Sequence, residues 1–191
     1  IPIVRTIKEG LATNKITKVY GILNGTCNYI LSQMEKTKDS FKNVLKNAQK
    51  LGYAEPGNPK LDLNGYDALA KVKILSALAF NCKISKSQSL MEGIEKIEAT
   101  DFDIVEKLNL RIKLLGITEI INNKIFERVH PCLVSRDSYI GNVTDVMNAV
   151  ILEGKPVGES VMQGEGAGPG PTTSALMLSL IHISEPTRQE A

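Results

Sequence analysis

One long apolar helix limits what this chain can fold into. Between Tyr66 and Asn81 the apolar side chains recur at helical spacing, at Leu69, Val72, Ile74, Leu75, Leu78 and Ala79. A helix of this kind must bury most of its surface against another layer of structure. Near its start, Asp67 and Lys71 are four residues apart and share one face. The sequence therefore predicts a packed helix with a carboxylate and an amine side by side at one end.

Shorter segments around this helix predict strands interleaved with further helices. The predicted strands are residues 16–23, 117–121, 124–134, 149–153 and 157–163, with a strand or turn at 89–94. The other predicted helices are residues 4–11, 28–36, 40–51 and 100–114. Ser40 is the expected N-cap of the third of these helices, and Asn122-Asn123 predicts a hairpin turn. We therefore expect an α/β fold in which a mixed β-sheet is layered with α-helices.

Composition narrows the class of protein. The 191 residues are 42% hydrophobic, which is enough for one good core and favours a single domain. The 23 basic and 21 acidic residues are interspersed, so the sequence indicates neither nucleic-acid binding nor a polybasic membrane patch. There is no run of apolar residues long enough to span a bilayer, and no signal segment opens the chain. We expect a soluble cytoplasmic protein.

The spacing of Asp67 and Lys71 allows two interpretations. The pair can be an ordinary surface ion pair on a helix, worth a few tenths of a kcal/mol. Alternatively, the carboxylate holds a substrate ammonium while the lysine moves a proton to or from an alcohol or carbonyl oxygen. Spacing alone does not separate the two.

Cysteines and histidines predict no metal centre. Cys27, Cys82 and Cys132 are widely spaced and form no CxxC pattern, so we expect buried or half-buried thiols. His130 follows a strand-like segment and His182 lies near the end of the chain, and neither has the neighbours of a catalytic triad or a zinc site. A structural role is expected for His130.

Both ends of the sequence are abrupt. The chain begins at Ile1 rather than Met, with sequence typical of a protein interior. Residues 178–188 resemble the conceptual translation of a sequencing-library adapter. We therefore expect residues 1–177 to be a domain truncated at both ends and residues 178–191 to be a non-native tail.

Five segments in order resemble homoserine dehydrogenase. They are Ile1–Ile3, Gly21–Leu31, Leu51–Pro56, Leu61–Lys71 and Gly164–Pro169. The resemblance implies the substrate-binding and dimerisation domain of a two-domain dehydrogenase, whose Rossmann domain is absent from this sequence. It also implies an oxidoreductase that interconverts L-homoserine and L-aspartate 4-semialdehyde with NAD or NADP, in threonine, methionine and isoleucine biosynthesis. The fragment alone is expected to be inactive, and a homodimer through the sheet domain is expected. The alternative is a non-catalytic α/β domain for dimerisation or small-molecule binding.

The resemblance also assigns roles in the substrate site. Lys71 corresponds to the lysine that gives a proton to the aldehyde oxygen and takes it back in the reverse reaction. Glu55 corresponds to the carboxylate that binds the homoserine ammonium, and Asp67 to a second carboxylate near the substrate. Asp62 corresponds to an acidic residue that orders the polar site, and Thr26 to a residue facing the substrate.

The glycine-rich segment Gly164–Gly170 allows three interpretations. A dinucleotide fingerprint requires a following helix, strand and acidic residue, and the sequence lacks this context. A flexible loop is the simpler interpretation. The resemblance implies instead a loop that closes over the cofactor, with Gly166, Ala167 and Gly168 approaching it closely. It further implies that the main-chain carbonyl of Ile1 is a ligand of a structural sodium ion.

Overall fold

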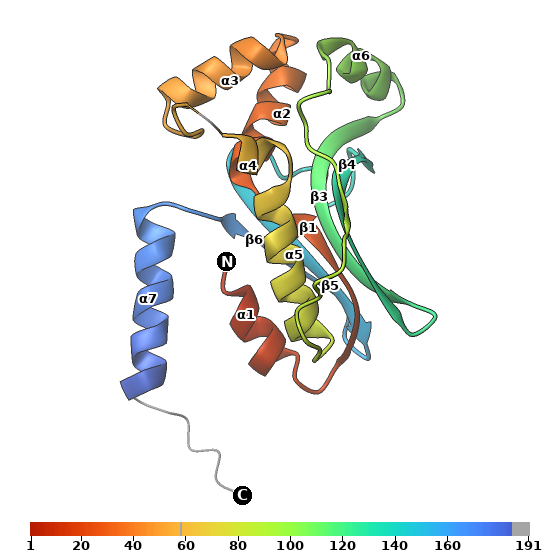
Figure 1. Ribbon diagram of the computed structural model, residues 1–191, viewed down its shortest axis with the longest axis vertical. Coiled ribbons are helices and arrows are strands. Elements are labelled where there is room, and N and C mark those ends of the chain that lie inside the picture. Colours follow the sequence, from red (N-terminus) through yellow and green to blue (C-terminus); the bar gives the residue numbers. More distant parts are fainter. Residues whose placement is uncertain (58, 185–191) are drawn as a thin grey trace, which may run out of the picture.

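A six-stranded β-sheet forms the centre of the molecule (Figure 1). The computed structural model describes residues 1–57 and 59–184. In spatial order the strands are β2 (Leu90–Met91), β4 (Lys124–Ser135), β3 (Leu110–Ile121), β1 (Lys15–Ile22), β5 (Met147–Lys155) and β6 (Gly158–Glu165). Strand β2 is parallel to β4, and the other neighbouring strands are antiparallel. The predicted α/β fold with a mixed sheet is confirmed.

Helices precede, separate and follow the strands. They are α1 (Ile3–Arg5), which continues as a π-helical turn (Thr6–Gly10), α2 (Gly25–Thr37), α3 (Phe41–Lys50), α4 (Lys60–Leu63), α5 (Tyr66–Ala79), α6 (Ala99–Lys107) and α7 (Pro169–Ser184). Ser40 caps α3 as predicted, since its side chain accepts a hydrogen bond from the Asn43 N–H. Among the described residues, no helix has the length and apolar character that crossing a membrane requires.

Helix α5 packs closely against the middle of the sheet. Its Val72 and Leu75 side chains are buried in a core cluster that also includes Val19 of β1 and Leu114 of β3. Gly116 of β3 makes this approach possible, because a Cβ there would lie 2.5 Å from Cγ2 of Val72. The long apolar helix predicted from the sequence is thus the main helical cover of this sheet face.

The opposite face of the sheet has its own apolar cluster. Its buried members come from strands and from the segment between β4 and β5: Ile22, Leu115, Ile117, Val134, Ile140, Val143, Ala149 and Ile151. Tyr20, Cys132 and Met147 pack against them. Within the described part of the chain, no helix contributes a side chain to this cluster. We call this surface the open face of the sheet because it lacks a helical cover, although the cluster members themselves are buried among the strands and the segment between β4 and β5.

The predicted helix over residues 100–114 is wrong in its second half. Helix α6 ends at Lys107, and Asn109 has a left-handed φ of 55°, which ends helical hydrogen bonding before β3 begins at Leu110. Residues 112–118 are all buried because β3 is covered on both faces. Residues 110–114 alternate apolar and basic side chains, which is a strand pattern that the predicted helix overran. The expectation for Cys82 is also wrong, since this thiol is exposed.

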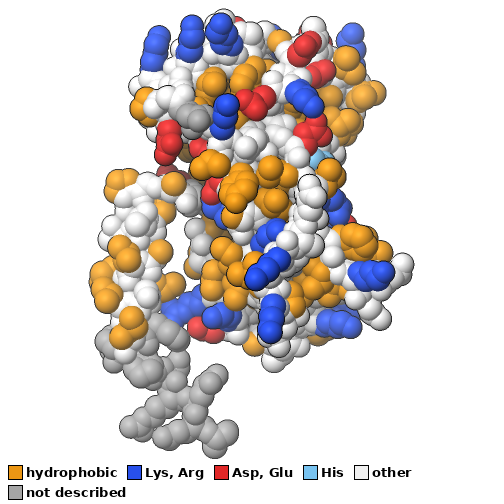
Figure 2. Space-filling view, in the orientation of Figure 1, with side chains coloured by type: hydrophobic (Ala, Val, Ile, Leu, Met, Phe, Trp, Pro, Cys, Tyr) orange, Lys and Arg blue, Asp and Glu red, His pale blue; other side chains and the backbone are white. Residues whose placement is uncertain are grey.

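The C-terminal helix α7 extends away from the sheet (Figure 1). It begins at Pro169, directly after the left-handed Gly168. Its apolar side chains Leu176 and Met177 are exposed, and Figure 2 shows hydrophobic side chains along this helix. Residues 178–184 belong to α7, and residues 185–191 lie outside the described residues. The non-native origin of residues 178–191 stays a prediction.

Candidate active site

Polar residues from α2, α4 and α5 meet where β1 ends. Asn24 follows β1 and is the N-cap of α2, because its Oδ1 accepts a hydrogen bond of 2.9 Å from the Cys27 N–H. Its Nδ2 donates to Oδ1 of Asp62 on α4 at 2.8 Å and to Oδ2 of Asp67 on α5 at 2.9 Å. Asn24 is only 7% exposed. One buried carboxamide therefore holds the two predicted carboxylates together.

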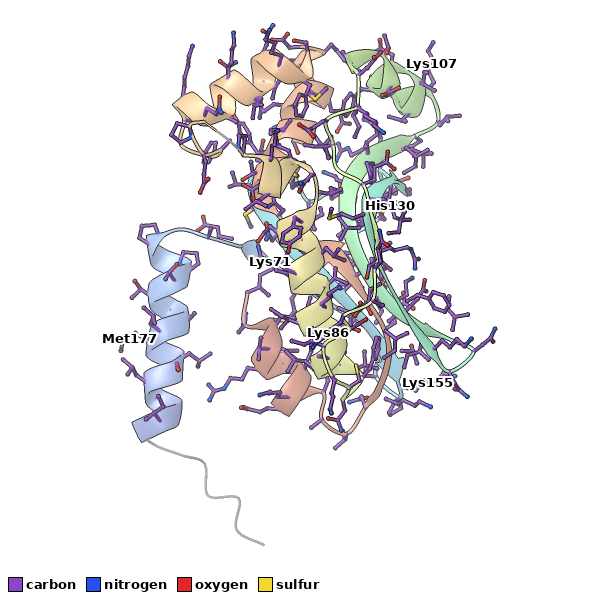
Figure 3. The ribbon with its side chains drawn as sticks, in the orientation of Figure 1. Lys71, Lys86, Lys107, His130, Lys155 and Met177 are labelled. Atoms are coloured by element: carbon purple, nitrogen blue, oxygen red, sulfur yellow. The ribbon has the colours of Figure 1, made fainter. Side chains whose placement is uncertain are left out.

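Lys71 completes this group from the next turn of α5, where Figure 3 labels it. Its Nζ donates to Oδ2 of Asp67 at 2.8 Å and to the carbonyl oxygen of Leu23 at 3.0 Å. The side chains of Lys71 and Asp67 are 48% and 33% exposed, so a ligand can reach both from solvent. The amine is therefore held in place on one side and accessible on the other, as a proton-transfer group requires.

Cys27 contacts the backbone of Asp62 from the interior of the molecule. Its Sγ donates to the carbonyl oxygen of Asp62 at 3.2 Å, and the residue is fully buried. Burial raises the pKa of the Cys27 thiol, and the nearby negative charges of Asp62 and Asp67 raise it further. The thiol thus stays protonated and acts as a hydrogen-bond donor rather than as a nucleophile.

The loop that carries Glu55 is attached to α2 through Tyr53. Thr26 Oγ1 donates to the carbonyl oxygen of Tyr53 at 2.8 Å, and the rings of Tyr53 and Tyr29 lie 4.7 Å apart. Glu55 is exposed, and its carbonyl oxygen accepts a hydrogen bond from Gln49. Within the described residues, no hydrogen bond or ion pair joins Glu55 to Lys71. The structure thus places Thr26 beside the Glu55 loop, and Glu55 stays outside the hydrogen-bonded group.

The glycine-rich segment approaches the start of α2 through one side chain. Asn148 of β5 lies against Gly166 and also near Gly25, the first residue of α2. Gly168 has a φ of 112°, which favours glycine. Ile1 lies beside Gly164, since its Cγ1 is 3.5 Å from the position of a Cβ on that glycine. The predicted cofactor segment and Ile1 are therefore neighbours.

Metal ligands of the common side-chain types are not gathered anywhere in the described structure. Among these residues, no group of three or more His, Cys, Asp or Glu side chains could hold a metal ion. His130 and Cys132 lie together on β4, with Sγ of Cys132 3.4 Å from Nδ1 of His130. His130 also contacts the carbonyl oxygen of Pro131. These contacts agree with the expected structural role of His130.

Comparison with known proteins decides the family. The homoserine dehydrogenase family profile matches residues 2–181, nearly the whole chain. The chain belongs to the homoserine dehydrogenase family. This result confirms the resemblance inferred from the five sequence segments.

Three members of the homoserine dehydrogenase family each match this chain with less than half of their own length. The Neisseria gonorrhoeae enzyme is 45% identical over 184 residues, which cover 96% of this chain and 42% of the relative. The Helicobacter pylori enzyme is 46% identical, with 96% of this chain and 44% of the relative covered. A crystal structure of the Thiobacillus denitrificans enzyme superposes with a TM-score of 0.92 at 42% identity, covering all of this chain and 45% of that chain. The activity of the whole enzymes is therefore assigned to this chain only as a proposal.

The structure adds residues to this homoserine dehydrogenase site that the sequence motifs did not single out. Asn24 lies in one of the five segments without a role of its own, yet it links Asp62 to Asp67. The preference of asparagine for N-cap positions was a usable signal for its cap, but not for its two carboxylate contacts. The Leu23 carbonyl and the Cys27 thiol carried no signal, because their contacts join residues distant in sequence.

Proposed function

We propose that residues 1–177 are the substrate-binding and catalytic domain of a homoserine dehydrogenase, which interconverts L-homoserine and L-aspartate 4-semialdehyde with NAD or NADP. The observation that carries this proposal is the group formed by Asn24, Asp62, Asp67 and Lys71 at the end of β1. A solvated surface pair of Asp67 and Lys71 would need neither a buried carboxamide nor a second carboxylate.

Lys71 is the proposed proton carrier. When bound, the nicotinamide cofactor would supply the hydride that is added to the aldehyde carbon, or in the reverse direction accept the hydride that leaves the alcohol carbon. The ammonium of Lys71 stabilises the negative charge that develops on the substrate oxygen and donates a proton to it. Asp67 and the Leu23 carbonyl hold the amine in place while it does so.

Carboxylates orient the other end of the substrate. Homoserine and aspartate semialdehyde both carry an ammonium group, which a carboxylate binds by charge-assisted hydrogen bonds. Glu55 has an exposed carboxylate on the loop next to Thr26, and Asp67 is partly exposed. We assign to Glu55 and Asp67 the binding of the substrate ammonium. Thr26 faces the substrate from α2, and Asp62 keeps the polar side chains of the site in order.

The cofactor contacts proposed for this chain lie in Gly166, Ala167 and Gly168. These residues are exposed, and the left-handed φ of Gly168 turns the backbone between β6 and α7. A solved archaeal homoserine dehydrogenase, 24% identical with a TM-score of 0.80, is a complex with NADPH. We propose that most of the cofactor is bound by the part of the relatives that this chain does not cover, and that the exposed apolar side of α7 packs there. The Ile1 carbonyl as a sodium ligand and the cytoplasmic location stay predictions.

We also propose that the open face of the sheet is the contact between two copies in a homodimer. Its apolar cluster lacks a helical cover in the described structure, although the opposite face is covered by α5. Val161 of β6 pairs with Ile151 on this face and is 39% exposed. A second copy offers a matching apolar surface, as a two-fold interface requires.

The proposed dimer is tested with two variants, each of which places one charge on a different face of the sheet. Val161→Glu places a carboxylate on the open face and should give monomers, because a buried unpaired charge opposes association. Leu133→Glu is the matched control, since Leu133 is 57% exposed and pairs with Ile112 on the helix-covered face. Light scattering after size-exclusion chromatography should show dimers for the unmodified protein and for the control. Monomers for all three proteins would refute the proposed dimer.

The proposed dehydrogenase activity is tested in a chimaera of full length. We define the chimaera as the Neisseria gonorrhoeae relative in which this chain replaces the matching segment. Homoserine-dependent reduction of NADP or NAD, followed by absorbance, should be detectable and should be lost in Lys71→Met. A folded chimaera that reduces neither cofactor would favour the alternative, a non-catalytic α/β dimerisation or small-molecule-binding domain.

A further inference from the structure

Asn148 joins two parts of the proposed site that come from distant segments of sequence. It is the second residue of β5, where its backbone pairs with Gly164 of β6. Val150 and Leu152, which share its side of the strand, belong to the core cluster beneath α5. The Asn148 side chain therefore points to the helix-covered face, at the end of the sheet where α2 begins.

Two glycines leave room for this carboxamide. A Cβ on Gly166 would lie 2.3 Å from Nδ2 of Asn148 and 2.7 Å from its Cγ, closer than side chains pack. A Cβ on Gly25 would lie 3.3 Å from Oδ1 of Asn148 and 2.8 Å from the carbonyl oxygen of Val146. The carboxamide thus fills the space between the first residue of α2 and the segment Gly166–Gly168, which we call the glycine loop.

The strand that carries Asn148 is held rigidly against α2. Asn28 of α2 donates from Nδ2 to the carbonyl oxygens of Met147 at 3.1 Å and Val143 at 3.2 Å. The buried Lys113 donates to Oδ1 of Asn28 at 3.1 Å, which fixes the orientation of that amide. Any movement of the Asn148 backbone relative to α2 would break these buried hydrogen bonds.

The Asn148 oxygen is enclosed but unpaired. Within the described residues, Oδ1 is the one buried side-chain N or O atom that has no hydrogen-bond partner. Leaving a buried acceptor unpaired costs about 1–3 kcal/mol. An apolar residue of similar size would avoid this cost, so stability alone does not account for an asparagine between the two glycines.

We propose that Asn148 is a positioning residue that sets where the glycine loop lies relative to the start of α2. This inference rests on the proposed function, in which the glycine loop contacts the nicotinamide cofactor and α2 begins beside the substrate. Asn148 then determines the distance between the two binding sites without being a proton carrier. Its loss should weaken cofactor binding, and the effect should depend on which residue occupies position 166.

A double-mutant cycle in the chimaera tests the contact. The variants are Asn148→Ala, Gly166→Ala and the two together, and the readout is the Kd for NADPH from its fluorescence. Each single change should raise Kd roughly tenfold, because each moves the glycine loop away from its position relative to α2. The double variant should bind about as well as Asn148→Ala alone, because the shortened side chain removes the clash with the new methyl group. If the two effects multiply instead, Asn148 does not position the loop through Gly166.

Further measurements separate positioning from a general loss of structure. Gly10→Ala is the control, since Gly10 lies outside the proposed site and a Cβ there would meet only Thr6 at 3.9 Å, and its Kd should be unchanged. Asn148→Ala should raise the KM for NADP and leave the KM for homoserine within a factor of about two. Equal increases in both KM values, together with a lower unfolding temperature, would overturn the inference. A chimaera that binds NADPH but does not oxidise homoserine would refute the proposed function while the double-mutant cycle still tests Asn148.

Discussion

The ammonium of Lys71 donates a 3.0 Å hydrogen bond to the main-chain carbonyl of Leu23. Leu23 directly follows β1, a strand in the interior of the sheet, so this bond attaches a side chain of α5 to the sheet backbone. The acceptor is a backbone oxygen, so replacing the Leu23 side chain would not remove it unless the backbone itself moved. The position of the amine is therefore determined by the fold rather than by one neighbouring side chain.

Replacing Lys71 should abolish turnover and leave substrate binding largely intact. In the chimaera, we expect Lys71→Met to lower kcat about 100- to 10,000-fold, the range for loss of a general acid or base. The KM for homoserine should change only a few-fold, because Glu55 and Asp67 remain. Lys71→Arg keeps the charge but cannot release its proton, so it should also have low turnover. Steady-state kinetics of both variants check this, and turnover near the unmodified level would exclude Lys71 as proton carrier.

Asn24 should contribute to stability through both its cap and its carboxylate contacts. Asn24→Ala removes the N-cap of α2 and two hydrogen bonds to charged groups, which should lower the free energy of unfolding by about 2–4 kcal/mol. Asn24→Ser retains a capping oxygen and should recover about 1 kcal/mol of that loss. Urea denaturation of the 191-residue chain measures both values. If the serine and alanine variants are equally unstable, the cap makes no contribution here.

Lys113 should make the stability rise with pH above 8. Lys113 is 1% exposed, its amine donates hydrogen bonds to Asn28 and to the Val143 carbonyl, and burial lowers its pKa from 10.5 to about 8. Between those values the unfolded chain binds the proton while the folded chain has lost it, so the free energy of unfolding increases with pH. The slope from this group is at most about 1.4 kcal/mol per pH unit.

The variant Lys113→Met isolates this contribution from other titrating groups. The difference in unfolding free energy between the unmodified chain and the variant should be constant below pH 7 and should grow in favour of the unmodified chain from pH 8 to 10.5. Urea denaturation at a series of pH values checks the trend. A difference that stays flat across this range would show that Lys113 titrates alike in the folded and unfolded chain.

Gly21 should be irreplaceable in the centre of the sheet. A Cβ on Gly21 would lie 2.0 Å from the carbonyl oxygen of Ala149, so Gly21→Ala must displace β1 or β5. We expect a loss of about 1–3 kcal/mol or more of unfolding free energy. Gly10→Ala is the matched control, because its Cβ would meet only Thr6 at 3.9 Å, and it should change stability by less than about 0.5 kcal/mol. Thermal unfolding compares the two, and similar losses would show that space at Gly21 is not the limiting factor.

Local sequence signals predicted the elements that depend on local chemistry. The apolar period between residues 66 and 81 predicted α5, which runs from Tyr66 to Ala79. Ser40 predicted the cap of α3, and Asn122-Asn123 predicted the hairpin between β3 and β4, where both asparagines adopt positive φ. These features succeed because the residues involved interact with their own neighbours in sequence.

Elements whose environment comes from distant residues were not predictable in the same way. Residues 110–114 were expected to continue a helix, but they pair with β4 and are covered on both faces. Their apolar and basic residues alternate as in a half-exposed strand, yet Lys113 is as buried as Ile112 and Leu114, which only the packing of β3 within the sheet decides. Cys82 was expected to be buried, and the local sequence contains nothing that reports its exposure.

The same distinction between local and distant contacts applies to the candidate site. The sequence by itself determined that Asp67 and Lys71 share a helix face, because four residues make about one helical turn. Only the tertiary structure decided that Asn24 links Asp62 to Asp67, that Leu23 orients Lys71, and that Asn148 lies between Gly25 and Gly166. The longest of these contacts in sequence joins Gly25 to Asn148, which are 123 positions apart. The physical reason is that hydrogen bonds and steric contacts depend on proximity in space, which the sheet order and helix packing establish.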